Sequence, residues 1–222
     1  AVVISRTWTL TDACGNSVSK VQTITVKDNL PPVMITHPTC IYINKYGLWT
    51  MNDLDVLEMT KDITDNCTAF KDLKIKISRR SFECKDTGKN KVLITATDLC
   101  GNVSTAYDYV TVLDTIKPVA KCQDATIYLD KFNQAYLIQN QINAGNDRES
   151  TPDWAKMFND LEGGSYDNCG VAALYLDKQL FTKADVGMNQ VTLKAVDPSG
   201  NFSTCTAWVN VKDTITPPAV TV

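Results

Sequence analysis

One short pattern occurs three times in the chain and constrains its fold more than any other feature. Each copy opens on an aspartate, has Gly-Asn three and four residues later, and ends on a second aspartate 16 residues after the first. The three aspartate pairs are Asp12 and Asp28, Asp98 and Asp114, and Asp197 and Asp213. A fixed internal pattern of this kind indicates a tandem array in which each repeat is one structural unit.

The residues on either side of the Gly-Asn turn alternate between apolar and polar, which is typical of strands with one buried face. Each repeat is therefore predicted to close with a long hairpin. The inward positions are Trp8, Leu10, Ile24 and Val26 in the first copy, Val92, Ile94, Ala96, Val110 and Val112 in the second, and Val191, Leu193, Ala195, Val209 and Val211 in the third. Trp8 is accordingly interpreted as a core residue rather than a binding residue.

Successive closing aspartates lie 86 and then 99 residues apart, which are the lengths of β-sandwich domains. We therefore predict an all-β fold made of tandem immunoglobulin-like Greek-key β-sandwich repeats. The predicted boundaries are 1–28 for the last strands of a truncated repeat, 29–114 and 115–213 for two complete repeats, and 214–222 for the start of another repeat or a linker.

The last complete repeat carries an insertion near residues 131–165, which makes it about 20 residues longer there than its neighbour. Within the insertion, Thr151 and Pro152 have the pattern of a helix start, and the apolar residues that follow have the spacing of a short amphipathic helix. This insertion is a candidate for recognition specific to one repeat. The alternative is a lid over an edge of the sandwich.

Eight cysteines are spread along the chain without any Cys-x-x-Cys pair, which favours disulfides over a zinc or redox site. Disulfides would place the chain in an oxidising compartment, whereas the alternative is a cytosolic protein with buried free thiols. In a sandwich whose first and last strands are parallel neighbours, Cys122 and Cys205 both begin strands at one pole. We predict a disulfide between them, which the chain-entropy model values at no more than about 4–5 kcal/mol.

The middle repeat has Ala106 at the position of Cys205, so Cys100 in the closing turn is taken as a substitute partner. Four cysteines permit three connectivities, and the one we predict is Cys40–Cys100 with Cys67–Cys84. Cys14 is expected to have its partner upstream of this sequence, and Cys169 is expected to be a free thiol.

Aspartate-rich loops are expected to meet at one pole of each complete repeat, because the linker, the Asp-Asn-Cys loop and the closing turn all lie there. Clustered carboxylates repel one another, and oxygen ligands from several loops are what Ca²⁺ binds. We predict a Ca²⁺ site at each junction, with the alternative that these residues only cap turns. The candidate ligands are Asp28, Asp65, Asn66, Asp98 and Asn102 at the first junction, and Asp114, Asp167, Asn168, Asp197 and Asn201 at the second.

Several classes of function are disfavoured by the composition. The net charge of −3 gives no basic surface for nucleic acid, and no apolar stretch approaches the roughly 18 residues that span a bilayer. His37 is the only histidine, and the sequence has no nucleophile elbow or phosphate-binding loop. We therefore predict no enzymatic activity, no membrane insertion of this segment and no cofactor other than Ca²⁺.

The order of these features resembles a known type of module. A cysteine-containing strand, an Asp-Asn-Cys loop, Phe-x-Cys, Asp-x-x-Gly-Asn-x-Ser and a final Val-x-Val-x-Asp are similar to hyalin-repeat (HYR-like) modules. More narrowly, the segment from Arg6 to Asp28 is similar to repeat endings of giant cell-surface adhesins of the Bacteroidetes, including those of gliding motility. The chain departs from this pattern at Lys183, where Phe-x-Cys has its cysteine, and at Ala106.

The resemblance implies export through the outer membrane and a non-catalytic role in adhesion or as a stalk at the cell surface. The expected partners are neighbouring repeats of the same chain and surface glycans or other cell-surface material. One alternative is a carbohydrate-binding module in which Tyr42, Tyr46 and Trp49 form an exposed row. Another is an ancillary domain of a secreted hydrolase.

Overall fold

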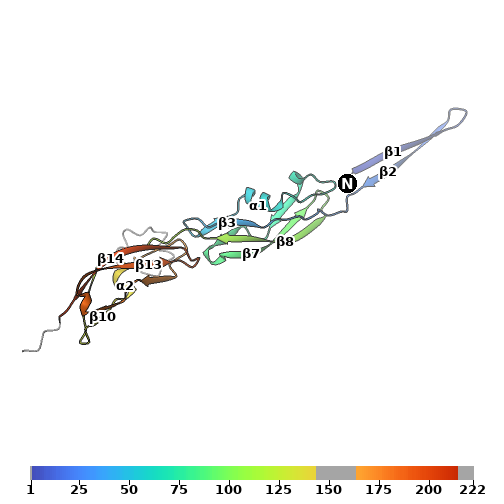
Figure 1. Ribbon diagram of the computed structural model, residues 1–222. Helices are drawn as coiled ribbons and strands as arrows, with labels where there is room; N and C mark the ends of the chain where they lie inside the picture. The colour runs from blue at the N-terminus through green and yellow to red at the C-terminus, as the bar shows by residue number, and fades with distance from the viewer. Residues whose placement is uncertain (1, 144–163, 215–222) are drawn as a thin grey trace, which may run out of the picture. The chain divides into compact units, whose positions relative to one another are not determined.

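The computed structural model describes residues 2–143 and 164–214, and strands account for most of the regular structure in these two ranges (Figure 1). The prediction of an all-β fold is confirmed. The helix predicted after Thr151 lies outside the described residues, as do most of the insertion and residues 215–222.

The chain divides into two compact units. One unit comprises residues 1–40, 51–80 and 89–111, and the other comprises residues 41–50, 81–88 and 112–222. The second unit thus includes two segments of the predicted middle repeat. The domain boundaries at Asp28 and Asp114 remain predictions.

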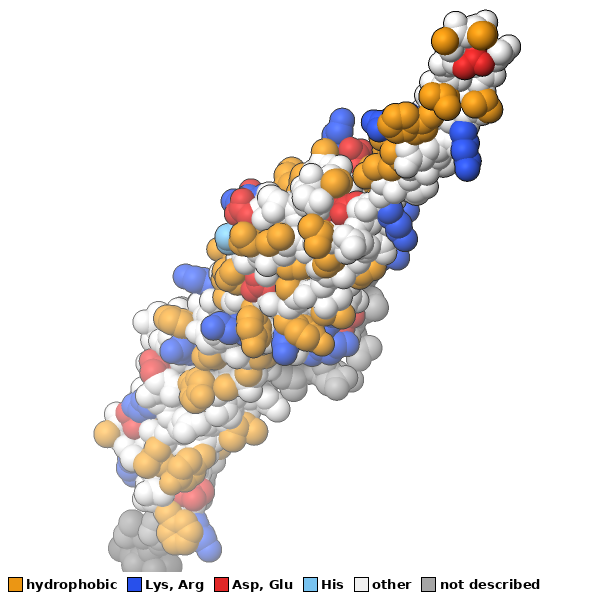
Figure 2. Space-filling model, turned by 90° about the vertical axis from the view of Figure 1, so that its right-hand side faces the viewer, with side chains coloured by type: hydrophobic (Ala, Val, Ile, Leu, Met, Phe, Trp, Pro, Cys, Tyr) orange, Lys and Arg blue, Asp and Glu red, His pale blue; other side chains and the backbone are white. Residues whose placement is uncertain are grey.

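The first hairpin pairs β1 (Val2–Thr11) with β2 (Ser17–Val26) in an antiparallel register from Val2 opposite Val26 to Thr11 opposite Ser17. Most of its apolar side chains are exposed, as Figure 2 shows at the top of the view. The prediction that Trp8 is a core residue is wrong. Among the described residues, the Trp8 side chain is 58% exposed and its Nε1–H donates to the Gln22 side chain. The physical reason is that the other predicted inward residues of this hairpin pack against no second described sheet.

The predicted last repeat contains one four-stranded sheet, in which two neighbouring pairs of strands are antiparallel and one pair is parallel. The strands of this sheet follow the order β11 (Ala173–Leu176), β13 (Gly187–Val196), β14 (Phe202–Lys212) and β9 (Ala125–Tyr128). β14 and β9 run parallel, which confirms the arrangement of first and last strands on which the Cys122–Cys205 prediction rested. A second sheet pairs β10 (Gln134–Tyr136) with β12 (Leu180–Thr182).

The core of this repeat takes side chains from both sheets. Val191, Leu193, Val209 and Val211 of the large sheet pack with Phe181 of the small one, and each of them is at most 1% exposed. Such a core, shared by two sheets, is that of a β-sandwich. A short helix, α2 (Gln139–Ile142), contributes the buried Ile142 to the same core.

The middle repeat has the same succession of strands. Its sheets have the orders β3-β8-β7-β5 and β4-β6. The strands are β3 (Thr39–Tyr42), β4 (Leu48–Thr50), β5 (Lys74–Ile77), β6 (Ser81–Glu83), β7 (Gly88–Thr97) and β8 (Val103–Leu113). The predicted inward residues of β7 and β8, from Val92 to Val112, are buried, so the alternation was interpreted correctly here.

A helix in the middle repeat, α1 (Asp53–Thr60), was not predicted. Asn52 caps it by accepting hydrogen bonds from the backbone of Leu54 and Asp55, and the Asp55 side chain accepts one in return from the Asn52 backbone. Val56 and Met59 are its buried face. Three single-turn 3₁₀ helices complete the described structure: η1 (Phe70–Asp72), η2 (Cys84–Asp86) and η3 (Lys183–Asp185).

Candidate functional site

The first aspartate of each closing turn is a turn cap. Asp98 accepts the Asn102 backbone N–H through Oδ1 at 2.8 Å and the Asn102 amide through Oδ2 at 2.7 Å. Burial would raise the pKa of Asp98, but these hydrogen bonds outweigh it and lower that pKa. Asp197 with Asn201, and Asp12 with Asn16, have the same arrangement. The turn-capping alternative therefore accounts for both oxygens of these aspartates.

The asparagine of the closing turn also holds the preceding linker. The Asn102 amide donates to the backbone carbonyls of Asp28 at 3.2 Å and Leu30 at 3.3 Å. The Asn201 amide donates in the same way to Asp114 at 3.1 Å and Ile116 at 3.3 Å. The predicted convergence of linker and closing turn at one pole is thus present twice.

At the first junction, Asp28, Asp65 and Asp98 each place a carboxylate oxygen within 4.8 Å of the other two. Asp65 Oδ1 accepts the backbone N–H groups of Cys67 and Thr68 at 3.0 and 2.7 Å, so its orientation is fixed by its own loop. The Oδ2 atoms of Asp28 and Asp65 are buried and receive no hydrogen bond. Two acceptors are therefore directed into this cluster without a donor.

At the second junction, Asp114 and Asp167 are 6% and 2% exposed and have oxygens within 4.8 Å of each other. Burial, followed by the charges of Asp114 and Asp197, raises the pKa of Asp167 to about 6. Burial also raises the pKa of Asp114, whose Oδ2 receives no hydrogen bond. Cys169 adjoins this cluster but is part of a disulfide, so it offers no thiolate.

The side chain of Asn168 lies between the two carboxylates of the second junction. Its amide donates to Asp114 Oδ1 at 3.3 Å or, with the amide rotated by half a turn, to Asp167 Oδ1 and Oδ2 at 3.2 and 3.1 Å. Asn66 donates to Asp28 Oδ1 at 3.4 Å at the first junction. The ten predicted ligands thus form three groups. Asp98 and Asp197 cap the closing turns, and the four asparagines donate hydrogen bonds between loops. The other four are carboxylates that can receive a cation: Asp28, Asp65, Asp114 and Asp167.

These four carboxylates are better suited to binding a hard divalent cation than to remaining as unpaired anions. Buried carboxylate oxygens without donors are costly as anions, and their electrostatic repulsion is relieved either by protonation or by a bound cation. All the available ligands are oxygens, which Ca²⁺ prefers. Asp98 and Asp197 can complete each cluster only if a cation competes with their asparagine hydrogen bonds.

Two disulfides are present among the described residues. The predicted Cys122–Cys205 bond is confirmed. The other bond joins Cys84 to Cys169, so the predictions of a Cys67–Cys84 bond and of a free Cys169 are wrong. Cys14, Cys40, Cys67 and Cys100 are free thiols.

The Cys40–Cys100 prediction is wrong because it matched Cys40 to Cys122. Cys40 lies within β3 next to the buried Ile41, whereas Cys122 lies ahead of β9, where the buried residue is Ile127. The end of β3 adjoins the end of β8, since the Ile43 N–H donates to Leu113 O at 2.9 Å. Cys100 precedes Val103, at the opposite end of β8.

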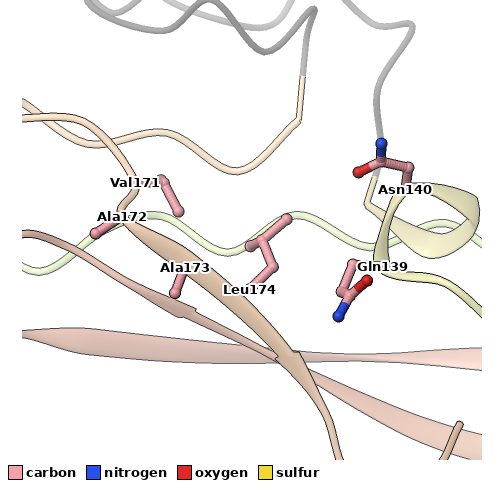
Figure 3. Close-up of a pocket in the computed structure, with 6 residues that line it drawn as sticks. All are labelled: Gln139, Asn140, Val171, Ala172, Ala173 and Leu174. Atoms are coloured by element: carbon pink, nitrogen blue, oxygen red, sulfur yellow. The ribbon is translucent and has the colours of Figure 1, made fainter.

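The proposed aromatic row for carbohydrate is incomplete. Tyr42 and Tyr46 are 55% and 47% exposed, but Trp49 is half-buried in β4, opposite the fully buried Phe82. A cavity of about 230 Å³ lies elsewhere, between α2 and the start of β11 (Figure 3). Among the described residues, Gln139, Asn140 and the segment 171–174 line it, and none of these has a titratable side chain.

No protein-family model and no curated protein matches the chain. The described residues contain no helix long and apolar enough to cross a membrane. Among solved structures, the chain is similar to PcdhgB3 EC1-4 at 10% identity and a TM-score of 0.32, with 96% of this chain and 58% of that chain covered. It is also similar to mouse PcdhgC3 EC1-3, at 13% identity and a TM-score of 0.32 over 95% of this chain and 77% of that one. The chain is also similar to human Protocadherin-24 EC1-2, at 12% identity and a TM-score of 0.34, with 84% of this chain and 100% of that chain covered. These TM-scores are too low to support an inference about function.

Proposed function

We propose that the chain is a non-catalytic stalk or adhesion segment of a large secreted protein attached to the outer surface of the cell. The observation that carries this proposal is the Cys84–Cys169 disulfide, which links residues of two successive predicted repeats. A covalent link between repeats resists bending and separation, which is useful in a stalk. The similarity of the repeat endings to Bacteroidetes adhesins supports the finer assignment to that group, including a role in gliding motility.

Calcium is the second part of the proposal. Asp28 and Asp65 would hold a Ca²⁺ ion at the first junction, and Asp114 and Asp167 would hold one at the second. Because each pair combines a linker aspartate with a loop aspartate of the following repeat, a bound cation would stiffen the linker. Its function would be mechanical, since it would neutralise carboxylates and fix the linker without activating a substrate.

The surface location is tested on intact cells that produce the parent protein. An antibody raised against this chain should label unpermeabilised cells, and external protease should remove that label. Labelling that requires cell lysis would contradict the proposal.

The mechanical role is tested by pulling on the two ends of the chain. The two disulfide loops, with sequence separations of 85 and 83 residues, should stay closed until a reductant is added. Because the loops overlap, reduction should lengthen the fully extended chain by roughly 280 Å, at about 3.4 Å per released residue. Equal extension before and after reduction would contradict the proposal.

A further inference from the structure

The loop around Cys67 and the loop around Cys169 have the same internal hydrogen bonds. The cysteine N–H donates to Asp65 Oδ1 at 3.0 Å in one loop and to Asp167 Oδ2 at 2.7 Å in the other. Asn66 donates to the sulfur of Cys67 at 3.1 Å, and with its amide unrotated Asn168 donates to the sulfur of Cys169 at 3.4 Å. Val33 forms a bridge with Thr64 next to the first loop, as Val119 does with Tyr166 next to the second. The two loops are therefore two copies of one structural motif.

The second loop is covered by two turns of the preceding predicted repeat. One turn ends at Gly47, where φ is +72° and an added Cβ would lie 2.7 Å from the Asn168 carbonyl oxygen. The other contains Cys84, whose N–H donates to Gly47 O at 3.1 Å and whose sulfur is bonded to Cys169. With its amide unrotated, Asn168 also donates to Asn44 O at 3.3 Å. Together the glycine turn and the Phe82-x-Cys84 turn fit the Asp-Asn-Cys loop closely.

The first loop has no such cover among the described residues. Cys67 is exposed and is not part of a disulfide. Next to it lies a hollow of about 430 Å³ lined by Leu30, Pro31, Val33 and the segment 64–66. Leu30, Pro31 and Val33 are apolar, and the Leu30 and Val33 side chains are 57% and 58% exposed. The surface of the hollow is therefore largely apolar. An exposed thiol beside an apolar hollow is what the second loop would present without Cys84 and Gly47.

We propose that Cys67 forms a disulfide with another copy of the repeat, at the position that Cys84 occupies in the middle repeat, and that the glycine turn of that copy fills the hollow. The inference rests on the proposed function, because it requires a further repeat ahead of residue 29. In the middle repeat, Cys84 lies 14 residues before Asp98, and the same spacing from Asp12 reaches a position three residues before Ala1. The last repeat is not the partner, since Lys183 stands at this position.

The bond forms by thiol–disulfide exchange with a protein or small-molecule disulfide as the oxidant. One cysteine attacks the oxidant as a thiolate, which forms a mixed disulfide and releases one thiol. The second cysteine then displaces the remaining half of the oxidant. The two repeat thiols thereby lose two protons and two electrons, and the oxidant is reduced to two thiols.

The experiment duplicates the middle repeat within the full chain, so that residues 1–114 are followed directly by residues 29–222. The second copy of Cys67 then follows a copy of Cys84, as Cys169 does in the natural chain. After secretion into an oxidising compartment, peptide mapping without reduction should find three disulfides, including one between the first Cys84 and the second Cys67. The first Cys67 should still react with N-ethylmaleimide in the folded protein.

The matched control carries Cys84→Ser in the first repeat copy only. Both copies of Cys67 should then react, while the other two disulfides form normally. A Cys67–Cys100 bond in either chain, or a second Cys67 that stays reactive although the other two disulfides have formed, would overturn the proposal. Neither result would alter surface labelling or calcium binding, so failure here is distinguishable from failure of the proposed function.

Discussion

The pole that contains Cys67 and the pole that contains Cys169 differ in what lies against them, although their loops are alike. At the first pole, Asp28 and Asp65 are half-buried and Asn66 is exposed. At the second, Asp114, Asp167 and Asn168 are all buried, and Cys169 is bonded to Cys84. Each loop thus sets its own conformation through local hydrogen bonds, whereas the neighbouring turns determine how strongly its carboxylates are desolvated.

The largest expected effect comes from removing the covalent part of this difference. The double substitution Cys84→Ala and Cys169→Ala should lower the free energy of unfolding by at most about 4–5 kcal/mol, because the disulfide closes a loop with a sequence separation of 85 residues. Chemical denaturation measures the loss. The matched control is Cys67→Ala, which should leave the stability within about 0.5 kcal/mol of that of the natural chain. Equal losses in the two variants would mean that the two poles do not differ as described.

Calcium should stabilise the chain through both poles. At a free concentration 100 times the dissociation constant, one site contributes about 2.7 kcal/mol, so the melting temperature should fall when a chelator is added. Replacing Asp114 and Asp167 together by asparagine should remove the response of the second pole and raise the stability of the calcium-free chain, because two repelling buried charges are lost. Asp12→Asn is the control, since Asp12 has the same turn contacts as Asp98 and Asp197 but belongs to neither cluster. An unchanged melting temperature in chelator would contradict the calcium proposal.

The linker contacts predict a smaller difference between matched asparagines. Asn201→Ala removes two hydrogen bonds to the linker carbonyls of Asp114 and Ile116, so it should cost about 1–3 kcal/mol. Asn16→Ala removes only the contact to Asp12 in an exposed turn and should cost about 1 kcal/mol or less. Denaturant midpoints measure both. An equal cost for the two substitutions would show that the linker contacts do not contribute.

The last prediction concerns pH. The pKa of Asp167 rises from 3.8 to about 6 on folding, so between these values the folded state binds more protons than the unfolded state. The stability of the calcium-free chain should therefore fall as the pH rises through this window, and the contribution should level off above about pH 6. Asp167→Asn should flatten the profile of melting temperature against pH. A profile that rises through the window in the natural chain and is unaffected by the substitution would contradict the assignment.

Local periodicity was sufficient to predict the sandwich strands and one disulfide. Val191, Leu193 and Ala195 alternate with polar neighbours, and strand order alone brings Cys122 to Cys205. The Cys84–Cys169 bond was missed because cysteines were paired within one predicted repeat. A signal was available in the last repeat, which keeps Cys169 in its Asp-Asn-Cys loop but has Lys183 at the position of Cys84. The cysteine of this loop therefore has no partner at that position inside its own repeat.

Three other features show where reasoning from the sequence was limited. The capping pattern Asn52-x-x-Asp55, with Val56 and Met59 on one face, could have revealed α1 but is short enough to be taken for a loop. The burial of Trp8 depends on which other strands cover its hairpin, and residue alternation in the hairpin does not determine this. The sorting of the acidic residues into turn caps and open carboxylates required the hydrogen-bond geometry, because all of them belong to similar Asp-Asn or Asp-x-x-Gly-Asn patterns.

The most direct test of the account is peptide mapping of the intact chain, alkylated at low pH and digested without reduction. We predict that Cys84 is joined to Cys169 and Cys122 to Cys205, with Cys67 alkylated. A Cys67–Cys84 bond, or an alkylated Cys169, would contradict the claim that successive repeats are joined covalently at their poles.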